Sequence, residues 1–256
     1  MARPCNVAPM QTERFKSFDG AELAFHTIGE GSVVVLLHGF LSSAQANWFG
    51  PGIAQALAES GHKVVAPDLR GHGQSAAPTD LASWPKDVLA SDQFALVEHL
   101  RLKQFDLVGY SLGARTAVRA MARGLSPSRA ALGGMGASGV MQAGARAEMF
   151  EDSIRHGEAA KDPRAGKRIQ RMLAEGGLNP EAMLGVLASF KETTEDELRG
   201  IAVPTLVVCG QNDRDNGSPD ELAALLPNAT LQMVPGDHIG AVGAPELKQA
   251  IVDYLR

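Results

Sequence analysis

Cysteine is scarce in this chain, and so are the apolar segments that would place it in a membrane. Only two cysteines, Cys5 and Cys209, occur among 256 residues, which excludes the dense disulfide framework of a small secreted domain. No apolar run approaches the roughly 20 residues of a membrane-spanning helix. The first fifteen residues include Pro4 and Pro9 and lack the apolar core of a signal peptide. We therefore expect a cytoplasmic protein with no membrane partner.

Net positive charge is also lacking. The chain has 24 Lys and Arg residues against 29 Asp and Glu residues, a net charge of −5, whereas a nucleic-acid-binding domain carries a basic patch. The densest basic stretch, Arg164-Ala-Gly-Lys167-Arg168 followed by Arg171, is surrounded by acidic residues. We interpret this stretch as a solvated helix face, and we expect no nucleic-acid partner.

Sequence patterns that bind metals or nucleotides are missing. The histidines and cysteines show no H-x-x-H or C-x-x-C spacing, and no glycine pattern of a phosphate-binding loop occurs. We expect the protein to use no metal and no other cofactor.

What the chain does have is an alternation of short apolar runs with helical segments. Runs typical of buried strands cover 32–37, 63–68, 105–108, 204–210 and 230–234, and helical segments lie near 53–60, 85–101, 114–121, 219–226 and 245–255. Two earlier runs, 13–18 and 22–27, flank Asp19-Gly20 and predict an antiparallel hairpin. This alternation predicts an α/β fold, with a doubly wound and mostly parallel sheet of about eight strands.

The interval from Met141 to about Glu197 breaks the alternation. It contains no strand pattern, and helix-forming residues dominate it. We interpret it as a short helical cap inserted after the sixth strand of the sheet, which we place in the apolar stretch 130–140. The predicted organisation is one core domain, made of residues 1–140 and 198–256, with a cap at 141–197.

The pentapeptide Gly109-Tyr110-Ser111-Leu112-Gly113 lies between a predicted strand and a predicted helix. Glycine on both sides of the serine relieves the crowding of a sharp turn, and such a turn exposes the serine Oγ above the sheet beside a helix N-terminus. A hydroxyl held in this way is positioned to attack a carbonyl carbon. Ser111 is therefore the predicted nucleophile.

A serine nucleophile needs a base, and the base needs an acid that orients it. Among the seven histidines, His238 lies in a small-residue loop after the last predicted strand, at the edge where parallel α/β sheets build their sites. For the acid, Asp213 and Asp215 both follow a buried strand, and we favour Asp213 with Asp215 as the alternative. Residues 133–147 contain no acid, so an acid after the preceding strand is excluded.

With a nucleophile, an acid and a base in this order along the chain, the sequence resembles the serine hydrolases of the α/β-hydrolase fold, especially esterases with a small helical cap. His38-Gly39-Phe40 resembles the oxyanion loop of that family. The resemblance implies an oxyanion hole made by the backbone N–H groups of Phe40 and Leu112. For His38 we expect a role in orienting this loop.

The stretch from Asp68 to Ser75 resembles another common segment of the family, Asp-x-Arg-Gly-x-Gly-x-Ser. We expect its role to be structural, with Asp68 and Arg70 satisfying either loop backbone groups or each other.

A serine at this turn supports acyl transfer. Water could not release an alkyl group bound to Ser111 as an ether, so dehalogenation and epoxide hydrolysis, for which fold relatives use a carboxylate, are not expected. The leading interpretation is a hydrolase that acts on a small-molecule carboxylic ester with water. Perhydrolase, lactonase or C–C bond hydrolase activity with the same residues, or a receptor function, are the alternatives.

Apolar residues near the predicted site give the one indication of the substrate. The predicted contacts to a small or medium hydrophobic acyl or alcohol group are Phe40, Trp48, Phe150, Met183 and Leu187. Such residues could equally bury the cap against the core. Nothing in the sequence indicates a charged substrate group, and Arg115 could either pair with an acid or face solvent.

Overall fold

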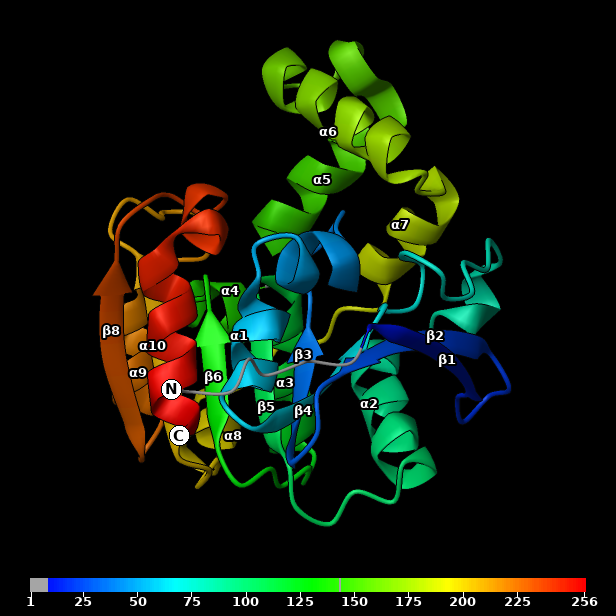
Figure 1. The fold of residues 1–256 in the computed structure, drawn as a ribbon. Coiled ribbons are helices and arrows are strands. Elements are labelled where there is room, and N and C mark those ends of the chain that lie inside the picture. Colours follow the sequence, from blue (N-terminus) through cyan, green and yellow to red (C-terminus); the bar gives the residue numbers. More distant parts are fainter. Residues whose placement is uncertain (1–8, 143) are drawn as a thin grey trace.

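The computed structural model describes residues 9–142 and 144–256, which fold around an eight-stranded sheet (Figure 1). The strands are β1 (Gln11–Lys16), β2 (Glu22–Ile28), β3 (Ser32–Leu37), β4 (His62–Pro67), β5 (Asp106–Tyr110), β6 (Ala130–Gly133), β7 (Thr205–Gly210) and β8 (Ala229–Val234). Their spatial order is β1-β2-β4-β3-β5-β6-β7-β8. β1 and β2 run antiparallel to their neighbours as the predicted hairpin, and the other strands are parallel. The predicted fold class is confirmed.

Helices cover both faces of the sheet. α1 (Ile53–Glu59) and α10 (Pro245–Leu255) lie on one face, whereas α2 (Val88–His99), α3 (Leu112–Ala122), α8 (Glu195–Arg199) and α9 (Pro219–Leu225) lie on the other (Figure 1). A separate buried apolar cluster fills each interface, one including Ile53 and Leu247 and the other including Leu96 and Val118. Because both faces of the sheet are covered, its central strands are continuous apolar runs.

The carboxyl ends of the parallel strands meet at one edge of the sheet. Tyr110 at the end of β5 lies opposite Gly133, Gly133 lies opposite Val208, and Gly210 at the end of β7 lies opposite Val234. The loops that leave β5, β7 and β8 therefore start side by side, although long stretches of chain separate them.

A group of helices between β6 and β7 lies above this edge (Figure 1). After the short α4 (Ala137–Met141) it consists of α5 (Gly144–His156), α6 (Pro163–Gly176) and α7 (Pro180–Ala188). Asp162 and Asn179 accept hydrogen bonds from the first N–H groups of α6 and α7, and each is followed by a proline at the first helical position. These helices occupy the place of the predicted cap, whose limits at 141 and 197 stay a prediction.

No helix in the described part of the chain has both the length and the apolar character needed to cross a membrane. Cys209 is a free, buried cysteine, and Cys5 lies outside the described residues.

A buried ionic cluster joins the hairpin to the segment that follows β4. The guanidinium of Arg70 is fully buried and lies 2.7 Å from an oxygen of Asp92 and 2.6 Å from an oxygen of Asp19. Ser17 Oγ donates to Asp92 at 2.5 Å. Arg70 is thus paired with these two carboxylates.

Asp68 has a different set of partners. It accepts hydrogen bonds from the N–H groups of Ala44 and Gln74 and from His26 Nε2, and Ser75 Oγ donates to its carbonyl oxygen. Of the two predicted alternatives, Asp68 satisfies loop backbone groups, and it does not pair with Arg70.

Removal of the Arg70 guanidinium should strongly destabilise the protein. In Arg70→Leu the Asp92 carboxylate would remain buried without its cation, and we expect the free energy of unfolding to fall by about 3–5 kcal/mol. The measurement is urea denaturation at neutral pH. Arg199→Gln, which breaks an exposed ion pair with Glu195, serves as the control and should cost less than about 1 kcal/mol. Equal effects of the two variants would contradict a stabilising role of the buried cluster.

Candidate active site

Ser111 occupies a strained turn between β5 and α3. Its backbone angles are φ 53° and ψ −114°, a region that costs a non-glycine residue on the order of 1–3 kcal/mol. The flanking glycines allow this conformation. A Cβ on Gly113 would lie 1.9 Å from the carbonyl oxygen of Leu37, and one on Gly109 would lie 2.4 Å from the carbonyl carbon of Gly113. The helix can therefore begin directly against the sheet, with the serine at its N-terminus.

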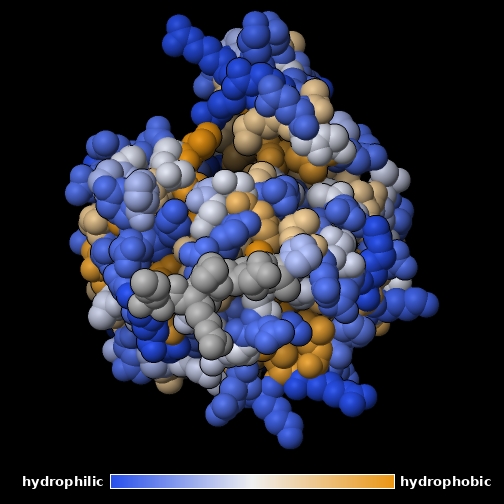
Figure 2. Space-filling model, viewed as in Figure 1, coloured by the Kyte–Doolittle hydropathy of each residue, from blue (hydrophilic) through white to orange (hydrophobic). Residues whose placement is uncertain are grey.

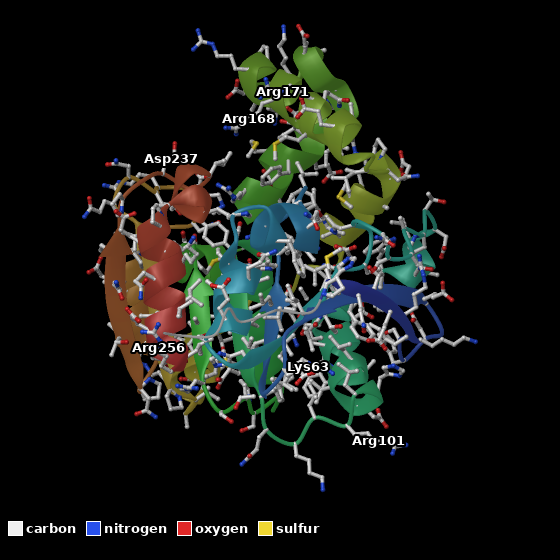
Figure 3. All side chains as sticks on the ribbon, viewed as in Figure 1. Lys63, Arg101, Arg168, Arg171, Asp237 and Arg256 are labelled. Carbon is white, nitrogen blue, oxygen red and sulfur yellow. The ribbon has the colours of Figure 1, made fainter. Side chains whose placement is uncertain are left out.

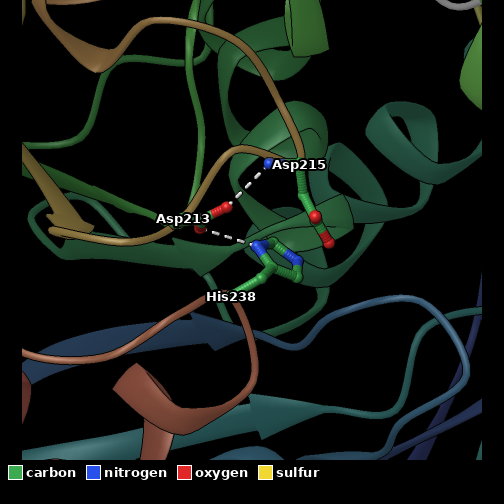
Figure 4. A group of neighbouring side chains, drawn as sticks. All are labelled: Asp213, Asp215 and His238. Carbon is green, nitrogen blue, oxygen red and sulfur yellow. Dashed lines mark hydrogen bonds and ion pairs between the residues drawn. The ribbon is translucent and has the colours of Figure 1, made fainter.

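His238 lies in the loop between β8 and α10 and connects the serine to an acid. Its Nε2 is 2.9 Å from Ser111 Oγ. Its Nδ1 is 2.8 Å from Asp213 Oδ2 (Figure 4). An ionised carboxylate can only accept a hydrogen bond, so Nδ1 carries the proton and Nε2 is free to accept one from the serine hydroxyl. The three side chains thus form one continuous hydrogen-bonded chain.

Asp213, rather than Asp215, is hydrogen-bonded to the histidine. Burial of the Asp213 carboxyl raises its pKa, but hydrogen bonds from His238 and from the N–H of Asp215 outweigh this effect and hold the pKa below its usual range. The thiol of Cys209 also lies 3.6 Å from Asp213 Oδ2. The carboxylate of Asp215 instead pairs with Arg146 at 2.9 Å. The alternative acid is therefore engaged elsewhere.

Two further residues position the loop that carries His238. The buried hydroxyl of Tyr110 donates to the carbonyl oxygen of His238 at 2.7 Å, and the two rings are 5.5 Å apart. Asp237 accepts from the N–H groups of Ile239 and Gly240 and so closes the turn after the histidine. Tyr110 was not a predicted site residue, because the second position of the pentapeptide carries no constraint that is visible in the sequence.

The backbone N–H groups of Phe40 and Leu112 donate to no other described residue. Leu112 is the first residue of α3, where N–H groups have no partner inside the helix, and both residues line the same cavity as Ser111. These N–H groups are therefore available to a bound oxyanion, and their role as an oxyanion hole stays a prediction.

His38 holds the loop that contains Phe40. Its Nε2 accepts from the N–H of Leu69 at 2.9 Å, and its Nδ1 donates to the carbonyl oxygen of Gly39 at 2.8 Å. Burial lowers the pKa of His38 and keeps the ring neutral. The N–H of Gly39 donates in turn to Asn47 Oδ1 at 2.9 Å. These contacts match the orienting role expected for His38.

Asp213, Asp215 and His238 are the one group of side chains in the described residues whose donor atoms lie close enough together to hold a cation. These groups already have partners, since Asp213 is bonded to His238 (Figure 4) and Asp215 is paired with Arg146. An ion ligated by the carboxylate and by Nδ1 would displace the hydrogen bond between Asp213 and His238. We therefore interpret the group as the acid and base that serve Ser111.

A cavity of about 330 Å³ lies between the sheet edge and the cap helices, and Ser111 and His238 form part of its wall. Figure 2 shows apolar surface in the hollow beneath these helices. The larger apolar side chains that line it are Phe40, Leu41, Leu112, Met135, Phe150, Ile169, Met172, Leu187, Phe190 and Ile239. Three of the predicted substrate contacts, Phe40, Phe150 and Leu187, are among them. The rings of Phe40 and Phe150 pack edge to face at 5.0 Å and connect the loop after β3 to α5.

Trp48 and Met183 do not line this cavity, so the prediction that they contact the substrate is wrong. Trp48 is fully buried in the short π-helical turn Gln45–Phe49 and belongs to the apolar cluster beneath α1 and α10. Met183 is fully buried on α7, where its terminal methyl packs near Gly71. Composition alone does not reveal which side of a helix faces a cavity and which side faces the core.

Three arginines line the cavity, and none of them was a site residue predicted from the sequence. Arg115 on α3 is 5% exposed, so it does not face solvent, and it forms no ion pair within the described chain. Arg168 on α6 belongs to the basic stretch that was expected to be a solvated face; its side chain is exposed, yet it borders the cavity. Arg146 on α5 is the third. Only Arg115 had a signal in the sequence, since it lies one helical turn after Ser111.

Comparisons with known proteins agree with this architecture. A family model described as alpha/beta hydrolase fold matches residues 32–131. Bifunctional epoxide hydrolase 2 of Sus scrofa is 35% identical over 95 residues, which are 37% of this chain but only 16% of that protein. A non-heme haloperoxidase of Rhodococcus erythropolis is 28% identical over 250 residues, covering 85% of this chain and 89% of that protein.

The same fold is found among solved structures. An esterase from Exiguobacterium antarcticum superposes with a TM-score of 0.78 at 20% identity, covering 94% of this chain and 98% of that one. Likeness at this level of identity shows a shared fold alone. The shared fold agrees with the family model that matches residues 32–131. The chain has the α/β-hydrolase fold, and its residues 32–131 match the family model of that description.

Proposed function

We propose that this protein is a serine hydrolase that cleaves carboxylic esters through an acyl-enzyme. The observation that carries the proposal is the continuous hydrogen-bonded chain from Ser111 through His238 to Asp213 in the wall of an apolar cavity. Each member has the protonation state that nucleophilic attack requires: a hydroxyl, an imidazole with an accepting nitrogen, and an ionised carboxylate.

In the first half of the reaction, Ser111 Oγ attacks the ester carbonyl carbon while His238 Nε2 takes the hydroxyl proton. The Asp213 carboxylate stabilises the imidazolium that forms and keeps the ring in its orientation. The tetrahedral intermediate then collapses, the bond to the alcohol oxygen breaks, and His238 returns the proton to the leaving alcohol. The acyl group remains bonded to Ser111.

In the second half, a water molecule takes the place of the alcohol. His238 removes a proton from the water as its oxygen attacks the acyl carbon, and the proton passes to Ser111 Oγ as the carboxylic acid leaves. In both halves the negative charge on the carbonyl oxygen would be held by the N–H groups of Phe40 and Leu112. Loss of one such donor typically costs about 10²–10³ in turnover.

Because the proposed nucleophile is a serine hydroxyl, we do not propose for this protein the epoxide hydrolase activity named for the Sus scrofa relative. Opening of an epoxide or displacement of a halide by Ser111 would leave an ether, which the acid–base pair described above has no means to hydrolyse. An acyl-serine ester, by contrast, can be hydrolysed by the same proton transfers that formed it. The apolar cavity wall supports a small or medium hydrophobic acyl or alcohol group.

A second candidate function is favoured by the haloperoxidase name of the relative that covers most of this chain. Hydrogen peroxide could replace water in the second half-reaction, so that the acyl group leaves as a peracid, and the peracid would then oxidise a halide. This route uses the same acyl-enzyme and needs no further group on the protein.

Ser111→Ala should abolish ester hydrolysis, because Ser111 is the proposed nucleophile. It should leave the fold intact, because alanine keeps the Cβ and fits the same turn with a smaller side chain. We expect a loss of at least about 10⁴ in kcat/KM. The assay uses p-nitrophenyl esters from acetate to dodecanoate, with circular dichroism to verify folding. Wild-type turnover in the variant would refute the proposed nucleophile. The chain-length optimum of the wild type reports the size of the cavity.

Asp213→Asn and Asp215→Asn form a matched pair. The first variant keeps the shape of the side chain but removes the charge that stabilises the imidazolium, and we expect kcat to fall by roughly 10⁴. The second variant alters the ion pair with Arg146 and should change kcat by less than tenfold. Both are assayed on the best p-nitrophenyl ester. A larger loss in Asp215→Asn would reverse the assignment of the acid.

Peracid formation is tested by bromination of monochlorodimedone in the presence of acetate, bromide and hydrogen peroxide. Any bromination that proceeds through the acyl-enzyme should disappear in Ser111→Ala. Bromination that is equal in the two proteins would exclude the serine route and with it the second candidate function.

A further inference from the structure

The cavity beside Ser111 carries more positive charge than its apolar lining led us to expect. Its charged side chains are Arg115, Arg146, Arg168 and Asp215. Arg146 and Asp215 form an ion pair with each other at 2.9 Å, and the guanidinium of Arg146 also lies over the ring of Phe150 at 5.3 Å. These two charges balance, which leaves the charges of Arg115 and Arg168.

Arg115 is a buried cation without a carboxylate partner. It donates to the carbonyl oxygens of Gly139 and Lys191, the second at 2.7 Å, and its guanidinium lies 4.9 Å from the centre of the Phe190 ring. These contacts use only part of the five N–H donors of a guanidinium. A buried charge that is left without a counter-ion is costly for a protein.

The charge of Arg115 persists at neutral pH. Burial and the neighbouring Arg119 lower the pKa of Arg115 to about 10, and the carboxylates of Asp87 and Glu192 oppose this effect through space. Asp87 is itself bonded to Arg119 at 2.7 Å. The cavity wall therefore presents a permanent cation one helical turn, or about 6 Å along the axis, beyond the proposed nucleophile.

Arg168 borders the cavity from the cap. It projects from the lower side of α6, toward the side of the molecule where the loop of Asp237 lies (Figure 3). No described residue forms an ion pair or hydrogen bond with it. Its neighbours on the same helix are engaged, since Lys167 pairs with Glu158 and Arg171 pairs with Glu175. Arg168 is thus available to a ligand in the cavity.

From this geometry we infer that the cavity binds the carboxylate of an anionic substrate through Arg115 and Arg168, so that the preferred esters are half-esters of dicarboxylic acids. The inference rests on the proposed esterase function, and it names the substrate class of that site. A carboxylate fits because two guanidinium groups can bond its two oxygens at once, while the apolar side chains of the cavity wall would contact the methylene chain. The sequence alone does not indicate such a charged group.

The test compares monoethyl esters of the dicarboxylic acids from butanedioic to octanedioic acid with ethyl esters of monocarboxylic acids of equal carbon number. The measured quantity is the ratio of kcat/KM for each half-ester to that for its neutral counterpart, from alcohol release at constant pH. We expect a ratio of about tenfold or more at the best chain length, the size of one charge-assisted hydrogen bond. The ratio cancels any general loss of activity in a variant.

Arg168→Gln should reduce this ratio at least about fivefold, because one of the two guanidinium contacts is lost. Arg171→Gln is the matched control: it removes the same charge from the same helix, at a residue that does not line the cavity, and should leave the ratio unchanged. Arg115→Met should also lower the ratio, and Arg115→Lys should restore part of it. If the Arg115 variants fail to fold, as judged by circular dichroism, the Arg168 pair decides the test alone.

Two results would overturn the inference while leaving the proposed function intact. The first is hydrolysis of the neutral esters, lost in Ser111→Ala, with a ratio at or below one at every chain length. The second is a high ratio that neither Arg168→Gln nor Arg115→Met reduces.

If the wild type hydrolyses neither class of ester, the proposed function has failed and the carboxylate site is judged by binding. Calorimetric titration of Ser111→Ala with monoethyl hexanedioate and with ethyl hexanoate compares the two ligands without turnover. Tighter binding of the half-ester, weakened by the further change Arg168→Gln, would support the site. Equal binding of both ligands, or binding of neither, would overturn it.

Discussion

The close packing of α3 against the sheet at Gly109 and Gly113 is the constraint on which the rest of the site depends. A Cβ at either position would overlap backbone atoms of a neighbouring element, so the helix can begin directly at the carboxyl end of β5 only if both residues are glycine. This forces Ser111 to positive φ and leaves the N–H of Leu112 unpaired at the helix start. The position of Ser111 therefore has a steric cause. The same cause accounts for its exposure to the cavity and for the unpaired N–H of Leu112 beside it.

Around this fixed point, buried polar contacts hold the other parts of the site in place. His38 bridges the loop after β3 to the backbone of Leu69, and the hydroxyl of Tyr110 fastens the backbone of His238. These partners lie far from one another in the sequence, and each buried group is satisfied by a specific atom. Burial keeps the His38 ring neutral, whereas hydrogen bonds from His238 and from the N–H of Asp215 keep the Asp213 carboxyl ionised in spite of its burial. The reacting groups are thus oriented before a substrate binds.

The helices between β6 and β7 determine what can reach the serine. They close an apolar space over the sheet edge, and they also bring Arg146 and Arg168 to it, while α3 contributes Arg115 from below. Apolar walls exclude water and strengthen any charge–charge interaction inside. In the proposed function, such a site would combine nucleophilic attack by Ser111 with binding of an anionic group at a distance from the reacting bond.

The sequence by itself determined the α/β class, the strand and helix alternation, and the likeness to α/β-hydrolases, because buried parallel strands and a glycine-flanked serine follow from local sterics and periodicity. It also indicated which two aspartates compete for the histidine. Tertiary structure alone decided between Asp213 and Asp215, removed Trp48 and Met183 from the cavity wall, and buried Arg115 without an acid. Those outcomes depend on which face of each element meets its neighbour, and on the partners that these polar groups find across the fold.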